Sequence, residues 1–402
     1  DWYGSSKTSN LVKLYFYADP NGNANQQAWA SAKGSFFDSV AECPRYLDSH
    51  KIKSIDRWGD VNWQSNSVVS AFHSAIHMDI LATDSPDWSN VTNLSNTFLS
   101  CKSLKDLNNS LSNANVCTSN VTNLSSMFKD CSVFQNTDLS SWDVRNVTSF
   151  AYMFNNNRLF NGNIDNWVLS SDSSKTITFN QFFRGALLFN RNINTKQNSN
   201  GEIAWDTVRV RLMQLMFCDC SSFDQPLDKW NTSLNVSTYL MFGADSRTPK
   251  QVMKFNQDIN TTYVQVGSKS YVAWDMSNNK TSVHMFKDNQ HFNKAIDNWN
   301  TSNIESFSGM FWGAKRFDQA INTASKTVNG VTYTAWDVAG SNIFGEMFYS
   351  AHSFNQPINN WNISARADYL TSQSTSDVAT VQIKKMFANA YSFNQDINTQ
   401  TV

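Results

Sequence analysis

The chain has little charge. Only 16% of its 402 residues are Asp, Glu, Lys or Arg, and the formal net charge is −1, whereas typical soluble proteins have roughly 25% charged residues. No basic block occurs, which argues against nucleic acid or anionic lipid as a partner. Glu occurs only four times. Most acids are therefore Asp, which together with Asn, Ser and Thr favours turns and caps over long helices.

Long apolar runs and Cys-x-x-Cys pairs are also missing. No stretch approaches the roughly 18–20 apolar residues of a membrane span, so we expect no transmembrane segment. The six cysteines include no Cys-x-x-Cys pair, which argues against a structural zinc site. Aromatic residues, in contrast, reach 13%, with 14 Trp and 28 Phe. A chain so aromatic is expected to fold.

Tryptophans mark an internal repeat. Four pairs of Trp are each 25 residues apart, and steps of 38, 44 and 37 residues separate the pairs. Short and long units therefore alternate, and we expect their tryptophans to form a buried ladder, because one unit cannot bury them alone. The ladder residues are Trp142, Trp167, Trp205, Trp230, Trp274, Trp299, Trp336 and Trp361.

The spacing within a unit predicts a short helix and a strand. Apolar residues recur at i, i+3, i+7 and i+10 from Val121 to Cys131, which is one face of a helix. The Ile-x-x-Trp segment that follows each Phe-Asn turn fits a short strand. The predicted fold class is an α/β repeat, a leucine-rich-repeat-like solenoid of strand, turn and short helix units.

Every second unit carries an insert between its Ile and its Trp. The inserts at about 194–203 and 322–334 have Asn-Gly near their centres, the strongest short hairpin signal. The insert at about 260–272 alternates apolar and polar residues on both sides of a Gly-Ser centre. We therefore predict three β-hairpins that line up on one side of the solenoid.

The repeat sets the predicted domains. Residues 1–56 lie outside it and are expected to cap the stack, and residues 57–402 form the repeat solenoid. The chain begins at Asp1 rather than Met, as expected of a processed or trimmed chain. It stops just after Ile397, where the next hairpin would begin. Solenoids normally end in a polar cap, so we expect either truncation there or a second molecule that completes the end.

Two motifs carry a family resemblance. The stretch 57–108 contains Trp58-Gly59-Asp60 and Asp84-Ser85-Pro86-Asp87, and the phrase Met-Phe-x-x-Ala-x-x-Phe-Asn-Gln-x-Ile-x-x-Trp recurs along the chain. Together they resemble the BspA-like leucine-rich-repeat surface proteins of bacteria and protists. The resemblance covers roughly residues 57–402. It implies a solenoid on an extracellular or cell-surface protein, adhesive or of unknown role, with no catalytic residues to carry over.

Two cysteines occupy equivalent places in adjacent units. Cys101 and Cys131 each lie three residues after a Phe, where other units have Ala. Neighbouring rungs about 5 Å apart satisfy the Cα separation of a disulfide, and the resemblance to surface proteins favours that bond. Alternatively, both cysteines are small buried residues that replace Ala.

Twelve positions fit the Asn-x-Ser/Thr pattern and are candidate glycan acceptors on exposed turns of a secreted protein. Alternatively, Asn-Val-Thr belongs to the repeat and the pattern is incidental. The candidates are Asn90, Asn93, Asn108, Asn120, Asn123, Asn146, Asn231, Asn235, Asn260, Asn279, Asn300 and Asn362.

Residues that bind metals or catalyse reactions are sparse. His73 and His77 are four apart on a predicted helix, near Asp79, but the Glu of a His-Glu-x-x-His motif is missing. We expect no cofactor, although recurring Asp and Asn at turns could hold Ca²⁺ between rungs or could satisfy turn backbone groups. These residues are Asp224, Asn256, Asn293, Asp318, Asn355 and Asn394.

The sequence therefore predicts a non-enzymatic extracellular scaffold. In this hypothesis the chain is a structural subunit of a cell-surface or fibrous assembly, glycosylated and self-associating end to end as a filament or homo-oligomer. The alternative is an adhesin or receptor module that binds a peptide or a glycan on one solenoid face. An enzyme is the third hypothesis, and no convergent polar set supports it.

Overall fold

The structure is a computed structural model that describes residues 49–59, 61, 63–66, 68–245, 251–363 and 381–397. The predicted capping segment 1–56 lies mostly outside the described residues, as does Cys43.

The chain forms two compact units. Unit 1 comprises residues Asp1–Ser170 and Gly185–Arg191, and unit 2 comprises Ser171–Arg184 and Asn192–Val402. Each unit has a buried core of Trp, Phe, Met and Ile side chains.

Regular secondary structure is scarce among the described residues. Unit 1 contains one parallel strand pair, and unit 2 contains another. Near the unit 2 pair, the Arg209 guanidinium donates to the Lys175 carbonyl at 2.9 Å, and Asp172 lies 3.6 Å from the Lys175 ammonium. The elements outside the hairpins are η3 (Ser49–Lys51), β1 (Ser54–Ile55), β2 (Asp79–Ile80), η4 (Ser110–Ser112), β3 (Ile177–Thr178), η5 (Thr207–Arg209) and β6 (Val210–Leu212).

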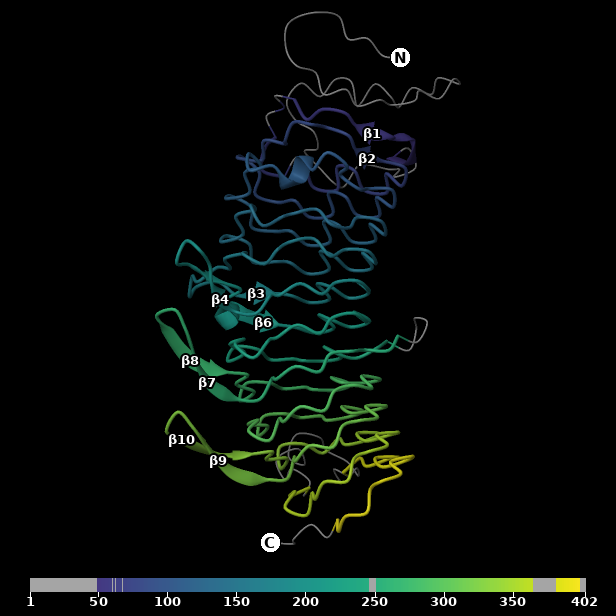
Figure 1. Ribbon diagram of the computed structural model, residues 1–402, viewed down its shortest axis with the longest axis vertical. Helices are drawn as coiled ribbons and strands as arrows, with labels where there is room; N and C mark the ends of the chain where they lie inside the picture. Colours follow the sequence, from purple (N-terminus) through teal and green to yellow (C-terminus); the bar gives the residue numbers. More distant parts are fainter. Residues whose placement is uncertain are drawn as a thin grey trace, which may run out of the picture. The chain divides into compact units, whose positions relative to one another are not determined.

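Three antiparallel hairpins lie where the sequence places its inserts. They are β4 (Lys196–Gln197) with β5 (Ile203–Ala204), β7 (Thr262–Val266) with β8 (Lys269–Ala273), and β9 (Ala324–Val328) with β10 (Val331–Ala335). Asn329 and Gly330 have φ angles of 49° and 75°, as a two-residue type I′ turn requires. Figure 1 shows all three on one side of unit 2.

The helix predicted from Val121 to Cys131 is wrong. No α-helix occurs among the described residues, and this segment is a series of tight turns. The amides of Met127 and Lys129 donate to carbonyls three residues back. The amides of Ser126 and Phe128 instead donate to carbonyls of the next turn, at 2.8 and 3.0 Å. An α-helix would send every amide to its own segment, whereas here alternate amides join neighbouring turns.

Left-handed residues make this alternation possible. Most tight-turn segments have two positive φ angles four residues apart, such as Ser126 (54°) and Asp130 (60°) in unit 1 and Gly309 (56°) and Gly313 (67°) in unit 2. A left-handed residue other than Gly costs about 1–2 kcal/mol. Hydrogen bonds between turns offset this cost, since each buried amide finds a carbonyl partner.

Consecutive turns within each unit run parallel. Isolated bridges join Asn93, Asn123 and Ser149 in unit 1, and they join Ser237, Thr281, Ser306, Ile343 and Gln382 in unit 2. Figure 1 shows these turns lying side by side.

Phenylalanine rings stack in columns through each core. In unit 1, Phe98, Phe128 and Phe154 lie 5.6 and 5.8 Å apart with nearly parallel rings. In unit 2 the corresponding column includes Phe286, Phe311 and Phe348, which are 5.6 and 5.7 Å apart. Because each ring buries both faces partly against rings of the adjacent turns, the columns require those turns to be present.

All eight ladder tryptophans are buried. Trp142 and Trp167 belong to unit 1, and the other six belong to unit 2. Consecutive rings from Trp274 through Trp299 and Trp336 to Trp361 lie 6.2–6.4 Å apart and within 10° of parallel. The indole N–H of Trp299 donates to the Ile259 carbonyl of the preceding turn at 2.8 Å, and its equivalents behave likewise.

Candidate functional site

The base of each hairpin is closed by the recurring Ile-Asn-Thr and Ala-Trp-Asp phrases. The Thr261 hydroxyl donates to the Trp274 carbonyl at 2.7 Å, and Thr195 and Thr323 donate equally to their own Trp residues. The Trp residues that follow hairpins have positive φ angles of 49–52°. The Thr hydroxyl therefore fixes a strained turn and separates the hairpin from the core.

The Asn of the same phrase holds the next turn. The Asn260 Oδ1 accepts the amide of Asn298 at 3.0 Å, and its Nδ2 donates to Asp297 at 2.9 Å. Asn194 and Asn322 make the equivalent contacts. This explains why Asn precedes every insert.

Side chains of the second and third hairpins hold each of these hairpins against earlier turns. Lys269 pairs with Asp206 at 2.6 Å, and the Tyr271 hydroxyl donates to the Lys229 carbonyl at 2.6 Å. In the third hairpin, Lys326 pairs with Asp297, and Tyr333 donates to the Asn298 carbonyl.

Partial burial and hydrogen bonding shift the pKa values of the side chains that make these hairpin contacts. Burial raises the pKa of Tyr271 and of Tyr333 to about 12. Burial also tends to raise the pKa of Asp297, but hydrogen bonds from Lys326 and Asn260 outweigh it, so that this pKa is lowered. Lys269 and Lys326 therefore each face a fixed carboxylate.

The outer side of the hairpins is exposed. Tyr263 is 51% exposed and Val331 64%. The hydroxyls of Thr327 and Thr332 face each other at 2.8 Å on the third hairpin. Among the described residues each hairpin is a separate two-stranded sheet, so its outer edges keep unpaired backbone groups.

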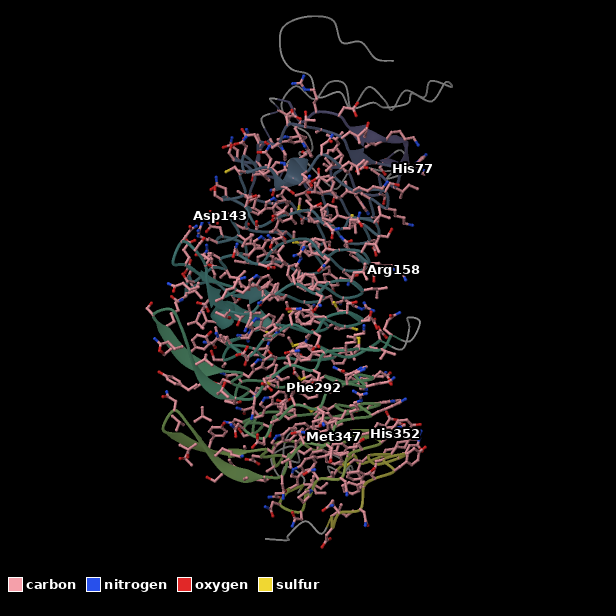
Figure 2. All side chains as sticks on the ribbon, viewed as in Figure 1. His77, Asp143, Arg158, Phe292, Met347 and His352 are labelled. Atoms are coloured by element: carbon pink, nitrogen blue, oxygen red, sulfur yellow. The ribbon has the colours of Figure 1, made fainter. Side chains whose placement is uncertain are left out.

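A second surface of unit 2 carries neighbouring aromatic rings in edge-on and tilted contacts. We call it the turn face, defined as the outward side chains of residues 282–291, 307–316, 344–353 and 383–392. Ring centroids lie 6.0 Å apart for His284 and Trp312, and 4.9 Å apart for Trp312 and Tyr349. The Lys287 ammonium lies 4.8 Å from the Trp312 ring centroid, within range of a cation–π contact. Figure 2 labels His352 on this face, on the side of unit 2 away from the hairpins.

His284 is held neutral within the turn face. Burial, and to a smaller extent the charge of Lys287, lower its pKa to about 4, against an opposing effect of Asp288. The ring lies over Gly309, where a Cβ would come within 2.2 Å of an imidazole carbon. Only Gly leaves room for this ring.

The predicted disulfide is wrong in the structure, since Cys101 and Cys131 are free and buried. Each thiol donates to the carbonyl of a Phe in the preceding turn, Phe72 or Phe98, at 3.0 Å. Burial raises the pKa of both thiols. Because equivalent side chains point the same way in adjacent turns, each sulfur faces a carbonyl, and the cysteines act as small buried residues.

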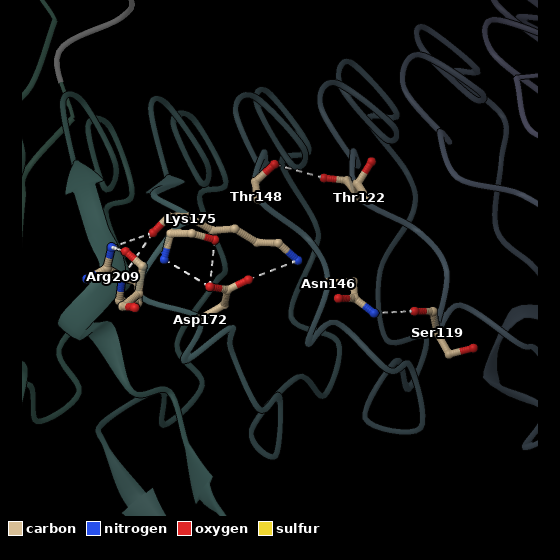
Figure 3. A network of polar contacts seen from close by, with 9 residues as sticks. Ser119, Thr122, Asn146, Thr148, Asp172, Lys175 and Arg209 are labelled. Carbon is tan, nitrogen blue, oxygen red and sulfur yellow. Dashed lines mark hydrogen bonds and ion pairs between the residues drawn. The ribbon is translucent and has the colours of Figure 1, made fainter.

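Several predicted glycan acceptors are part of the backbone ladder. Asn146 donates from Nδ2 to the Ser119 carbonyl at 2.8 Å (Figure 3), and Asn108 and Asn120 make similar contacts at 2.6 Å. Asn231, Asn235 and Asn279 are only 8%, 2% and 1% exposed, so these three are wrong as acceptors in the folded chain.

The other six candidates keep a solvent-facing side. Asn90 and Asn362 are exposed, and Asn93, Asn123, Asn260 and Asn300 are half-buried. The Oδ1 atoms of Asn93 and Asn123 accept the amide two residues on, at 3.0 and 2.9 Å, which leaves the glycan-accepting nitrogen outside that contact.

The Asp and Asn residues considered for Ca²⁺ form a ladder of their own. The Asn293 Oδ1 accepts the amide of Asp318 and the Gln319 side chain, both at 2.9 Å. Asp224, Asn256, Asp318 and Asn355 accept the next turn in the same way. These oxygens satisfy turn backbone groups, the alternative to metal binding left open by the sequence.

His73 and His77 do not lie on a helix, so spacing of four does not bring their rings together. His73 is half-buried and His77 exposed. Burial, and then the charge of Lys129, lower the pKa of His73. Within the described ranges, no group of three or more His, Cys, Asp or Glu is placed to hold a metal ion. The same residues contain no helix long and apolar enough to span a bilayer.

The aromatic turn face was missed by sequence reasoning. Its rings and lysines occupy the outward positions beside each Met-Phe pair, such as Lys287, Trp312 and Tyr349 directly after the core Phe. Aligning the repeats on Met-Phe would have placed these three residues in one column.

Comparison with known proteins gives a family. The model of "Mycoplasma protein of unknown function, DUF285" matches four successive segments, residues 66–196, 194–269, 265–372 and 365–402. No curated protein matches the chain, nor does any solved structure.

Proposed function

The chain belongs to the DUF285 family, and from this premise we propose that it is a non-enzymatic repeat scaffold folded as a solenoid. We further propose that it acts outside the cell or on its surface, as its resemblance to BspA-like proteins implies. The observation that carries the proposal is that equivalent residues in successive turns make the same contacts. Such repetition builds a long regular surface.

The polar groups of the ladder support a structural role. Side-chain amides such as that of Asn293 and the indole N–H groups of the Trp column hold one turn to the next. The Thr hydroxyl at each hairpin base joins the two ends of the insert. Groups committed to structural hydrogen bonds are poor candidates for acid–base or nucleophilic work, which needs activated side chains. Screening the chain against glycan and peptide substrates tests this, and turnover of any of them would contradict the proposal.

Self-association is the assembly mode that we propose for the scaffold. It would occur end to end or through the row of hairpins, whose outer edges have unpaired backbone groups. Analytical ultracentrifugation over a concentration series, with electron microscopy of the same sample, tests this. Oligomers or filaments are expected, and a monomer at every concentration would argue against assembly.

A second candidate function is ligand binding on the hairpin row. The exposure of Tyr263 and Val331 favours it, because the hairpins are otherwise fixed by their inner side chains. Replacing residues 262–273 by a short Gly-Ser link should then abolish ligand capture while the turns stay folded. The same replacement of residues 324–335 shows whether one hairpin or the whole row is needed.

A further inference from the structure

The turn face has an excess of positive charge among the described residues. Its residues include five cations, Lys287, Lys315, Arg316, Lys384 and Lys385, but only two acids, Asp288 and Glu346. Lys315, Arg316, Lys384 and Lys385 are exposed and make no ion pair with any described residue.

The hairpin side differs in this respect. Lys269 and Lys326 are both paired with carboxylates there. The whole chain has a net charge of −1, so the positive turn face is a local feature. Such a surplus attracts anions.

Two tyrosines of the turn face are accessible to different degrees, Tyr349 half-buried and Tyr391 exposed. The column after the core Phe runs Lys287, Trp312, Tyr349 and Ala388. The Lys287 ammonium lies over the Trp312 ring, and the tilted Tyr349 ring lies beside it. Tyr349 is half-buried, and the equivalent position of the next turn is the small Ala388.

Tyr391 is the more exposed of the two tyrosines. It is 76% exposed, and its centroid lies 5.0 Å from that of His352. The exposed Lys384 and Lys385 belong to the same turn as Tyr391.

Accessible tyrosine rings flanked by unpaired cations along a row of turns fit one ligand chemistry. Neighbouring turns follow one another at about the 4.8 Å spacing of paired strands. A chain of sugars offers flat C–H faces to tyrosine rings, and its carboxylate or sulfate groups pair with Lys and Arg. Single-stranded nucleic acid stacks its successive bases on ring faces, and Lys287 already occupies one face of Trp312.

We propose that the turn face of unit 2 binds an acidic polysaccharide. Tyr349 and Tyr391 stack on sugar rings, and Lys315, Arg316, Lys384 and Lys385 pair with its anionic groups. This inference goes beyond both proposed functions, because it places a ligand on the side of unit 2 away from the hairpins (Figure 2).

The test measures binding of the full chain to heparin, hyaluronan and neutral dextran by isothermal titration calorimetry, with oligo(dT) as a nucleic-acid polyanion. We expect at least one acidic polysaccharide to bind and dextran not to bind. Tyr349→Ala with Tyr391→Ala, and separately Lys384→Gln with Lys385→Gln, should each weaken binding about tenfold or more.

Arg211→Gln with Lys280→Gln is the matched control, because it removes two exposed charges of unit 2 outside the turn face. Its binding should stay near that of the parent chain, and urea unfolding should show every variant folded. Equal losses in the control, unchanged binding in the tyrosine variant, or tighter binding of oligo(dT) would each overturn the proposal. Replacing the hairpins should leave polysaccharide binding intact. The turn-face proposal and the hairpin-row proposal are therefore tested independently.

Discussion

At the scale of single residues, Gly309 is constrained both by its backbone conformation and by a neighbouring ring. Its φ is 56°, and a Cβ would lie within 2.2 Å of the His284 ring. Gly309→Ala should destabilise unit 2 by about 2–4 kcal/mol, since a left-handed alanine and a displaced ring both cost energy. Urea unfolding checks this.

The matched control is Gly330→Ala. Gly330 has a φ of 75° with nothing within 4 Å, so only the conformational cost of about 1–2 kcal/mol applies. Equal destabilisation at both sites would show that the imidazole does not constrain Gly309.

Asp106 should make stability depend on pH. Burial raises its pKa to about 6, although it accepts the amides of Leu111 and Ser110. A carboxyl with a raised folded-state pKa stabilises the fold fully below its unfolded value of about 4, and this contribution is lost as pH rises through about 6.

Unit 1 should accordingly be more stable at pH 5 than at pH 7.5, by about 1–2 kcal/mol at most. Asp106→Asn should flatten this part of the profile, because the amide does not ionise. Urea midpoints of both chains between pH 4 and 8 measure it, and identical slopes would contradict the assignment.

At the scale of elements, the Asn ladder needs an acceptor oxygen rather than a particular charge. Asn293→Asp should change the free energy of unfolding little, since Asp318 and Asp224 accept the amide of the next turn at equivalent positions. Asn293→Ala should cost about 0.5–1.5 kcal/mol, because it removes the acceptor of the solvent-exposed Asp318 amide. Thermal unfolding of the two variants compares them, and equal losses would refute the acceptor role.

The hairpin base should depend on one hydroxyl. Thr261→Val removes the donor to the Trp274 carbonyl and should cost about 1–3 kcal/mol. Amide exchange should then speed up in residues 262–273 more than in the Trp column. Thr327→Val, on the exposed face of the third hairpin, is the control and should change little.

The sequence predicted the hairpins and the buried tryptophans for physical reasons. An Asn-Gly centre such as 329–330 selects a type I′ turn locally. Large apolar side chains such as Trp are mostly buried, so Trp at a fixed spacing indicates a core. The helix failed because the spacing from Val121 to Cys131 suits a chain of tight turns equally well. Ser126 and Asp130 adopt left-handed φ angles without being Gly, so the residue types at these positions did not indicate the tight turns.

At the scale of the whole molecule, the repeat predicts which deletions fold. Removing residues 275–336 joins Trp274 to Asp337 and takes out one full Trp-to-Trp period of unit 2. Because each turn contacts chiefly its neighbours, the shortened chain should fold cooperatively with a lower urea midpoint. Removing residues 275–320 breaks the period and should give an unfolded or aggregated chain. Two equally well-folded products would refute a modular stack.

The Thr–Trp closure at the hairpin bases has a practical consequence. Since Thr261 and Trp274 meet through a side-chain hydroxyl and a carbonyl, what lies between them is a cassette whose content can vary without reaching the core. A foreign epitope grafted there would be displayed at a fixed anchor point, and natural diversification at the same point would cost the framework little.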